Sequence, residues 1–259
     1  MLSRVTELAR EAGAVIRSAD HIEARSKSGP ADFVTQYDGR VEQFLKEALT
    51  ALRPDAQFLG EESAHAVDEF SPLWIVDPID GTTNFIRGFS RSAVSICLCD
   101  RGVRQLGVIY DPYTDQLYAA ERGRGAFLNG APIHVSSRPA SEGISIFGTA
   151  AYDREFSDAT FRLARALFDR TLDVRRFGAA VLDFCDIAAG RAELFCECLL
   201  SPWDFAAGAL IVEEAGGAAT ALDGSPLPIA GKSSVFCSNA ACASERAALY
   251  AAASPLPAP

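Results

Sequence analysis

The most constraining feature of the chain is an apolar run that ends in two carboxylates, residues 74–85, which read Trp-Ile-Val-Asp-Pro-Ile-Asp-Gly-Thr-Thr-Asn-Phe. Residues 73–76 have the character of a buried strand, and the Pro and Gly that follow predict that it stops in a tight turn. Asp77 and Asp80 would then lie at the carboxyl end of a strand. Carboxylate oxygens are ligands that Mg²⁺ prefers, and the amides of Gly81 to Thr83, at a predicted helix N-terminus, can hold a phosphate. A turn with a capping Asp is the alternative interpretation.

Composition limits the classes of protein to which the chain can belong. Its 259 residues are 49% hydrophobic, which allows a substantial core and excludes a disordered or fibrous protein. A net charge of −10 argues against general binding to nucleic acids or anionic membranes. The seven cysteines show no disulfide spacing, so we expect buried thiols in a reducing cytoplasm. Cys196 and Cys198 alternate with Glu197 as in a strand, and zinc is not indicated.

The N-terminal half is predicted to contain two helices followed by a mostly antiparallel sheet. Apolar residues of 1–16 fall on one helical face and are interrupted by charges, which predicts a soluble amphipathic helix without a signal peptide or membrane span. A second helix is expected at 37–52, before Pro54. Strands are expected at 93–98 and 105–110, and Asn129-Gly130 indicates a tight hairpin.

From about Ser136 the pattern changes to one that is typical of an α/β arrangement. Strands are expected near 144–147, 192–196 and 235–238, and helices near 157–169, 179–189 and 205–215. We expect residues 1–135, with most of the metal ligands, and residues 136–253 to form one catalytic unit with a site along their seam. The Pro- and Ala-rich end, 254–259, is expected to be a flexible tail.

Three further acidic clusters occur along the chain, at 32–38, 60–63 and 202–204. The first can be a helix N-terminus, with Thr35 as the N-cap and Asp38 in the first turn. The adjacent Glu61 and Glu62 can be a solvated surface pair. Asp204 can be a simple N-cap of the helix that follows it. Each cluster therefore has an ordinary structural interpretation when it is taken alone.

Together the clusters match the pattern of a known family. The chain reads D-x-V-T-x-x-D from residue 32, G-E-E-S from 60, D-P-I-D-G-T-T-N-F from 77 and W-D from 203. In this order of motifs it resembles, over nearly its whole length, the inositol monophosphatase family of Mg²⁺-dependent, lithium-sensitive phosphatases. The resemblance implies a mixed α+β and α/β fold, a layered α-β-α-β-α sandwich of the inositol monophosphatase and fructose-bisphosphatase type. It also implies a homodimer and a site between the sheets.

The resemblance further implies a metal site with two to three Mg²⁺ ions. Glu61, Asp77 and the backbone carbonyl of Ile79 resemble the ligands of a first ion. Asp77, Asp80 and Asp204 resemble those of a second. A third, weaker ion would lie near Glu61.

By the same resemblance, Thr82 and Glu61 orient the attacking water, and Asp38 accepts a hydrogen bond from Thr82. The amides of Gly81 and Thr82 would bind the phosphate. Supporting roles, as caps or as partners of the ligands, are expected for Asp32, Glu62 and Asp183.

Such a site suits the hydrolysis of a phosphate monoester, which is very slow because water is a poor nucleophile and an alkoxide is a poor leaving group. Divalent ions address both problems, since they activate a water and stabilise charge on the leaving oxygen. The three histidines, His21, His65 and His134, lie outside every motif. Their positions argue against a phosphohistidine or a Ser-His-Asp mechanism.

The substrate side of the site favours a polyol monophosphate, above all myo-inositol monophosphate. Glu197 resembles the Glu that inositol-cleaving members place on the sugar hydroxyls, and Ala180 belongs to a segment that meets the ring. With Asp80, these are the expected substrate contacts. Members of the family commonly carry Ser where this chain has Ala179, so one hydroxyl near the substrate is absent here. A solvent-facing strand residue is the alternative interpretation of Glu197.

Other functions remain open at this stage. A metal core selects the phosphate better than the alcohol, so histidinol phosphate or another sugar or nucleotide phosphate is an alternative substrate. Thr83, Asn84 and Trp203 favour the inositol branch over histidinol phosphate, and the sequence shows no basic cluster for a second phosphate. Some bacterial relatives bind the transcription or ribosome-assembly machinery, so an interaction factor is an alternative of another class.

Overall fold

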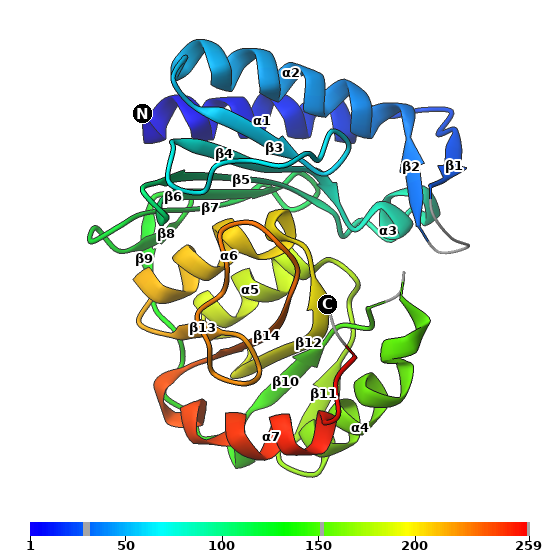
Figure 1. The fold of residues 1–259 in the computed structure, drawn as a ribbon, viewed down its shortest axis with the longest axis vertical. Helices are drawn as coiled ribbons and strands as arrows, with labels where there is room; N and C mark the ends of the chain where they lie inside the picture. Colours follow the sequence, from blue (N-terminus) through cyan, green and yellow to red (C-terminus); the bar gives the residue numbers. More distant parts are fainter. Residues whose placement is uncertain (28–31, 151–152, 258–259) are drawn as a thin grey trace.

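Two sheets organise the structure, and helices lie above, between and below them (Figure 1). This computed structural model describes residues 1–27, 32–150 and 153–257. The five layers alternate between helices and sheets, so the predicted α-β-α-β-α sandwich is confirmed.

The first sheet has seven strands in the order β3-β4-β5-β6-β7-β8-β9. β3 and β4 run parallel, and the other neighbours are antiparallel, as the sequence predicted for this half. The strands are β3 (Gln57–Gly60), β4 (Leu73–Asp80), β5 (Ala93–Asp100), β6 (Val103–Asp111), β7 (Gln116–Glu121), β8 (Ala126–Leu128) and β9 (Ala131–Ile133). Helices α1 (Leu2–Arg17) and α2 (Gln36–Leu52) cover its outer face (Figure 1).

The second sheet has five strands in the order β11-β10-β12-β14-β13, and β10 is parallel to both of its neighbours. The strands are β10 (Ile144–Phe147), β11 (Asp173–Arg175), β12 (Leu194–Leu200), β13 (Ala218–Thr220) and β14 (Ser233–Ser238). Helices α5 (Ala180–Ala188) and α6 (Pro202–Glu214) lie between the two sheets, and α4 (Ser157–Phe168) and α7 (Arg246–Ala253) cover the far face (Figure 1).

Short elements complete the fold beside the seam of the two halves. Strands β1 (Ala24–Ser26) and β2 (Phe33–Thr35) pair as an antiparallel ribbon, and α3 (Thr82–Arg87) follows β4 directly. Three 3₁₀ turns lie at η1 (Ala140–Glu142), η2 (Arg154–Phe156) and η3 (Ala240–Glu245). Asn129 and Gly130 form the hairpin turn between β8 and β9, as predicted.

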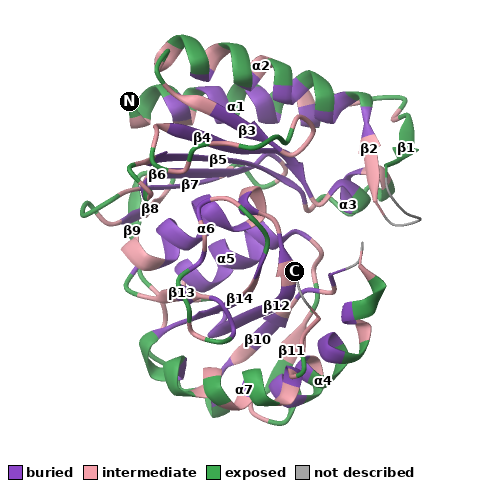
Figure 2. Ribbon diagram, in the orientation of Figure 1, coloured by how far each residue is buried: buried purple, intermediate pink, exposed green. Residues whose placement is uncertain are grey.

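Strand β4 is buried along its whole length because both faces of its sheet are covered (Figure 2). Since side chains alternate across a strand, Trp74 and Val76 pack in the core beneath α1 and α2. Leu73 and Ile75 belong instead to the core that surrounds α5 and α6. The same alternation in β12 places Glu197 on the opposite side from Cys196 and Cys198.

The end of β4 corrects one expectation. The strand does not stop before Pro78 but continues to Asp80, with a register shift between Asp77, which pairs with Ser95, and Asp80, which pairs with Ala93. Proline lacks the N–H that a regular ladder needs, and a bulge is where a sheet tolerates it. Both carboxylates therefore lie on the last, irregular residues of the strand rather than beyond it.

Helix α6 corrects a second expectation, because it begins at Pro202 and not at Phe205. Ser201 is the N-cap, Pro202 occupies the first helical position, and Asp204 lies in the first turn, where its Oδ2 accepts from the Ser201 amide at 2.7 Å. The interpretation of Asp204 as the N-cap is therefore wrong. The interpretation of Thr35 as an N-cap with Asp38 in the first turn is right, since the two residues form a capping box at the start of α2.

The C-terminal segment contains a helix, α7, that the sequence did not suggest. Arg162 on α4 donates to the carbonyl of Ala253 at 2.8 Å and to that of Ser254 at 3.4 Å. Of the expected tail at 254–259, the last two residues lie outside the described part of the chain.

Among the described residues, no helix is long and apolar enough to cross a bilayer. All seven cysteines are buried free thiols.

Candidate active site

A cavity of about 390 Å³ opens where the two halves of the chain meet. The N-terminal half lines it with the ends of β3 and β4 and the start of α3, and the C-terminal half with β12 and the start of α6. Its lining includes eight of the residues singled out from the sequence, namely Glu61, Asp77, Ile79, Asp80, Gly81, Thr82, Glu197 and Asp204. Chain segments that are far apart in the sequence therefore meet in one concave site.

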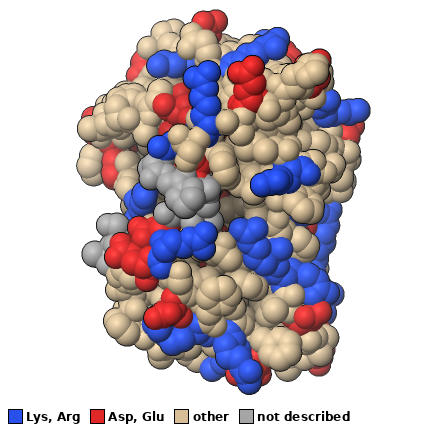
Figure 3. Space-filling model, turned by 90° about the vertical axis from the view of Figure 1, so that its right-hand side faces the viewer, with Lys and Arg blue, Asp and Glu red and all other residues tan. Residues whose placement is uncertain are grey.

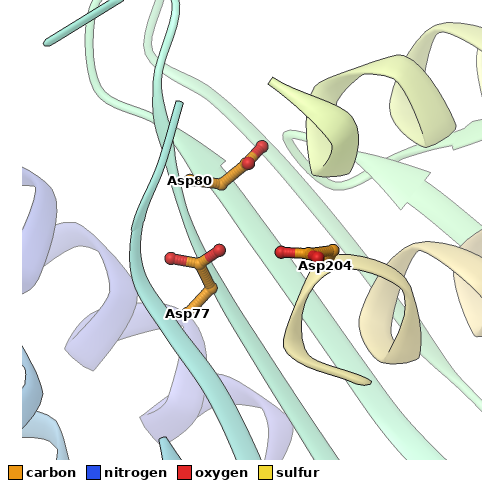
Figure 4. A group of neighbouring side chains, drawn as sticks. All are labelled: Asp77, Asp80 and Asp204. Carbon is orange, nitrogen blue, oxygen red and sulfur yellow. The ribbon is translucent and has the colours of Figure 1, made fainter. Parts of the chain in front are cut away.

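Three aspartates form the centre of this cavity. Asp77 and Asp80 come from the end of β4 and Asp204 from the first turn of α6, and each offers an oxygen within 4.8 Å of the others. Figure 4 shows the carboxylates of Asp77 and Asp204 facing one another, with that of Asp80 beside them and directed toward a neighbouring helix. Such a cluster has the all-oxygen donor set that hard divalent cations prefer.

Each of these aspartates is oriented by a hydrogen bond from the backbone. Asp77 Oδ1 accepts from the Ile79 amide at 3.0 Å, and Asp204 Oδ2 accepts from the Ser201 amide. Asp80 Oδ2 accepts from the amide of Val181, at the start of α5, at 2.9 Å. Each carboxylate thus has one oxygen held by a backbone amide. Its remaining lone pairs are available to a ligand in the cavity.

Burial and mutual repulsion make the cluster unfavourable in the ionised form. Burial raises the pKa of Asp77 and of Asp204 well above the usual range, and the surrounding carboxylates raise them further. Burial also raises the pKa of Asp80, to about 6, although the amides of Val181 and Ala180 and the charge of Arg91 oppose the shift. Divalent cations would remove this repulsion, so the residues present fit Mg²⁺ in both geometry and charge.

Glu61 lies in the same cavity but outside the group of three. Lys27 Nζ is 2.9 Å from Glu61 Oε1 and 2.6 Å from Glu62 Oε1, so one ammonium serves two glutamates. Burial raises the pKa of Glu61, and the charge of Lys27 opposes that shift. Glu62 is further held by its amide, which donates to buried Glu42 at 2.8 Å.

The Thr82 hydroxyl faces two acceptors. Its Oγ1 lies 3.1 Å from the carbonyl oxygen of Ile79 and 3.4 Å from Asp38 Oδ1. Asp38 is fully buried, and its other oxygen accepts from the amide of Thr35 at 2.8 Å. The hydroxyl has one proton, so it can donate to only one of these acceptors at a time. Asp38 is close enough to accept it, as the resemblance to the family implied.

Gly81 must be glycine for two reasons. Its φ of +80° lies in the left-handed region, which side chains rarely adopt. A Cβ at this position would also lie 2.9 Å from the Arg91 carbonyl oxygen and 3.1 Å from the Ala179 side chain. The close approach brings the start of α3 against the turn that precedes α5.

On the C-terminal side of the cavity, Glu197 is buried and projects toward it from β12. Its Oε1 accepts from the amide of Ala150 at 2.9 Å, and burial raises its pKa to about 7. The interpretation of Glu197 as a solvent-facing strand residue is therefore wrong. Ala180 is buried outside the cavity lining, beside the Val181 amide that binds Asp80.

Several residues of the site were not singled out from the sequence. Lys27, Asp153 and Lys232 line the cavity, and Arg91 lies behind it. Among the expected supporting residues, Asp32 lines the cavity, Glu62 pairs with Lys27 and Asp183 pairs with Arg91. The two basic partners lie far along the chain from their acids, and a lysine or arginine in a loop carries no local signal of such pairing.

Comparison with known proteins agrees with the fold and with the family resemblance of the sequence. The model of the inositol monophosphatase family matches residues 1–255. An inositol-1-monophosphatase of Rhizobium meliloti is 40% identical over 83% of this chain and 81% of its own length. A Nus factor SuhB of Pseudomonas aeruginosa is 39% identical over 87% of this chain and 86% of its own.

Solved structures show the same architecture. The extragenic suppressor protein suhB of Bartonella henselae superposes with a TM-score of 0.86, at 35% identity, over 97% of both chains. An IMPase/NADP phosphatase in complex with Mg²⁺ and phosphate gives a TM-score of 0.83, at 27% identity, over 95% of this chain and 92% of the other. These relatives include an inositol-1-monophosphatase, an IMPase/NADP phosphatase and a Nus factor.

Proposed function

This chain belongs to the inositol monophosphatase family, and from that premise we propose that it is a Mg²⁺-dependent phosphatase that hydrolyses myo-inositol monophosphate to inositol and phosphate. The observation that carries the proposal is the cluster of Asp77, Asp80 and Asp204 in the cavity between the halves. The structure of a family member with Mg²⁺ and phosphate bound supports it.

Two to three Mg²⁺ ions would be held by the acidic groups of the cavity. Glu61, Asp77 and the Ile79 carbonyl would hold the first, and Asp77, Asp80 and Asp204 the second. A third, weaker site would lie near Glu61, where the ion would take over the role that Lys27 has in this structure. When bound, the ions supply an activated water and neutralise charge at the leaving oxygen.

The protein groups around this centre position the reactants. Thr82 and Glu61 would orient the attacking water, and Asp38 would accept a hydrogen bond from the Thr82 hydroxyl and so fix the direction of its lone pairs. The amides of Gly81 and Thr82, which line the cavity at the start of α3, would bind the phosphate oxygens. No covalent phosphoenzyme is required.

Bound cations would also be needed to attract an anionic phosphate. The face that carries α3 and the β1–β2 ribbon displays Lys and Arg side chains with Asp and Glu beside them (Figure 3). The cavity itself is lined by seven carboxylates and two lysines, so divalent ions would have to offset its negative charge before the phosphate binds.

Recognition of the alcohol would depend on Glu197, Asp80 and the segment around Ala180. Glu197 Oε1 accepts from the Ala150 amide, and a carboxylate has further acceptor capacity that a sugar hydroxyl would use. The missing hydroxyl at Ala179 removes one contact of the inositol-cleaving pattern. Histidinol phosphate, another sugar phosphate or a nucleotide phosphate is therefore the alternative substrate, and the IMPase/NADP phosphatase is a relative of the last kind.

A role of another class is supported by the relatives named Nus factor SuhB. In that case the chain would act as an interaction factor in transcription or ribosome assembly, and catalysis would be secondary. With either role we propose a cytoplasmic homodimer that does not itself bind nucleic acid.

The test is phosphate release, with Mg²⁺, from myo-inositol 1-phosphate, histidinol phosphate, fructose 1,6-bisphosphate, glycerol 2-phosphate and adenosine 3′,5′-bisphosphate, with and without lithium. Preference for inositol phosphate, inhibited by lithium and lost in Asp77→Asn but not in the exposed control Asp55→Asn, supports the proposal. Preference for another ester keeps the metal mechanism and overturns the substrate. No turnover of any substrate favours the interaction role.

A further inference from the structure

Arg91 joins the two halves of the molecule beside α5, the helix whose Val181 amide binds Asp80. It lies between α3 and β5, and its Nη2 donates to Asp183 Oδ1 at 2.9 Å and to Asp186 Oδ2 at 2.8 Å. Its guanidinium also lies over the ring of Phe177, 4.2 Å from the centroid. Asp183 and Asp186 belong to α5, and Phe177 belongs to the turn before it. One arginine side chain therefore contacts this helix and its preceding turn at three points.

The backbone of the same region is tied together by Asn84. Its Nδ2 lies 2.9 Å from the carbonyl oxygens of Arg91 and Phe177 and 3.2 Å from that of Gly178. The amide has two N–H groups for these three acceptors, so they share its protons. Asn84 fixes where the Arg91 backbone meets the turn, and the Arg91 side chain fixes the helix that follows.

The helix held in this way determines the direction of a carboxylate in the cluster. Asp80 Oδ2 accepts from the Val181 amide, which is in the first turn of α5. The start of α5 can move relative to β4 only if the contacts of Arg91 and Asn84 give way. The orientation of Asp80 toward Asp77 and Asp204 therefore depends on contacts made several residues away.

We propose that Arg91 is a positioning residue for the metal site: by clamping Asp183 and Asp186 it holds α5 against the end of β4 and keeps the Asp80 carboxylate aligned with Asp77 and Asp204. The inference rests on the proposed function, in which these aspartates bind Mg²⁺. It adds a residue that touches neither ion nor substrate. Partners that orient metal ligands typically change metal affinity by one to two orders of magnitude when they are removed.

A purely structural role for Arg91 makes a different prediction. Asp183 is buried, and any cation beside it would offset the cost of its charge. Arg138 is a matched control for that role, since its Nε donates at 2.8 Å to Glu193, which is fully buried in the C-terminal half and does not line the cavity. Loss of either arginine leaves a buried carboxylate without its cation, but only Arg91 is connected to Asp80.

The experiment is isothermal titration of Mg²⁺ into the metal-free wild type, Arg91→Met, Arg91→Lys and Arg138→Met, with melting temperatures of each. We expect Arg91→Met to raise the Kd for Mg²⁺ about tenfold and Arg91→Lys to raise it by less, because one ammonium cannot bridge both carboxylates and cover Phe177. Arg138→Met should melt at a lower temperature but bind Mg²⁺ with the wild-type Kd.

Each outcome decides the matter. Wild-type affinity in Arg91→Met, or an equal loss of affinity in Arg138→Met, overturns the inference while leaving the proposed function intact. If Arg91→Met does not fold, wild-type affinity in Arg91→Lys overturns it. A wild type that binds no Mg²⁺ refutes the proposed function and this inference with it. In phosphate release, Arg91 variants should regain the wild-type kcat at saturating Mg²⁺, which a damaged substrate pocket would not allow.

Discussion

Lys27 Nζ lies 2.9 Å from Oε1 of Glu61, a carboxylate expected to bind a metal ion. The side chains are 25% and 17% exposed, so solvent screens the pair only partly. In the absence of ions, a lysine thus occupies the position of a cation beside Glu61. Lysine and metal are therefore expected to compete for this carboxylate.

Replacement of Lys27 by Met should destabilise the metal-free protein by about 2 kcal/mol, because Glu61 and Glu62 lose a charged partner. With Mg²⁺ the loss should shrink, since an ion can take the place of the ammonium. Urea unfolding of the wild type and the variant measures the loss of unfolding free energy without Mg²⁺ and the smaller loss with Mg²⁺. Lys232→Met, in the same cavity, is the control and should change neither. An equal loss with and without Mg²⁺ would contradict the competition.

Mg²⁺ should raise the melting temperature, because the ions bind the folded cluster and offset the repulsion among Asp77, Asp80 and Asp204. At a hundredfold excess over the Kd, the stabilisation is about 2.7 kcal/mol. For a chain of this size, that corresponds to about 5–10 °C. Thermal scans in MgCl₂ against NaCl of equal ionic strength test this. Asp77→Asn should lose most of the shift and Asp55→Asn should keep it; an unshifted wild type, even with phosphate present, refutes the metal site.

The stability of the metal-free protein should fall as the pH rises from about 4.5 to about 7, because burial raises the pKa of Glu197 from 4.5 to about 7. Below 4.5 the carboxyl is protonated in both states, and its contribution is fully present. As the pH rises, the unfolded chain loses the proton first, so the contribution is lost through pH 7 and amounts to about 3 kcal/mol.

Glu197→Gln, which cannot ionise, should remove that part of the pH dependence and make the metal-free protein more stable than the wild type at pH 8. Denaturant unfolding at pH 5, 6, 7 and 8 measures the difference. Glu47→Gln, an exposed residue on α2, serves as the control. Parallel curves for the wild type and Glu197→Gln would show that Glu197 ionises at its ordinary pKa.

Thr82→Ala should lower kcat by about 10²–10⁴-fold with little change in KM, because the hydroxyl that orients the water is lost while the phosphate-binding amides remain. Thr82→Ser should retain most of the activity. The exposed neighbour Thr83→Ala should behave as the wild type. A large rise in KM with unchanged kcat would place Thr82 in substrate binding instead of water orientation.

Part of the fold could be predicted from the sequence for a physical reason, because buried strands and amphipathic helices have local periodicities that mark the elements of each half. The layered arrangement and the meeting of the acidic motifs were implied instead by the resemblance to the family, since each motif alone also fits a turn or a helix cap. The layered fold is confirmed, and Asp77, Asp80 and Asp204 do meet. The assignment of each residue to an ion, to the water or to the alcohol stays a prediction.

What the sequence could not predict depends on distant contacts. Pro78 predicted the end of a strand, but a bulge lets β4 continue to Asp80. The pairing of Arg91 with Asp183 joins residues that are 92 positions apart, and no local pattern marks it. Such ion pairs become visible only once the packing of α5 against the first sheet is known.

The division of the aspartate cluster between β4 and the first turn of α6 also determines when ions can act on the folding of this protein. A chain that has built the first sheet, but has not yet docked α6 against it, holds the proposed ligands of the first ion but lacks Asp204, which the second ion needs. Interactions that form after the transition state change the unfolding rate and leave the folding rate nearly unchanged. Where α6 docks after the transition state, the ion that needs Asp204 is therefore expected to prolong the lifetime of the folded chain without hastening its formation.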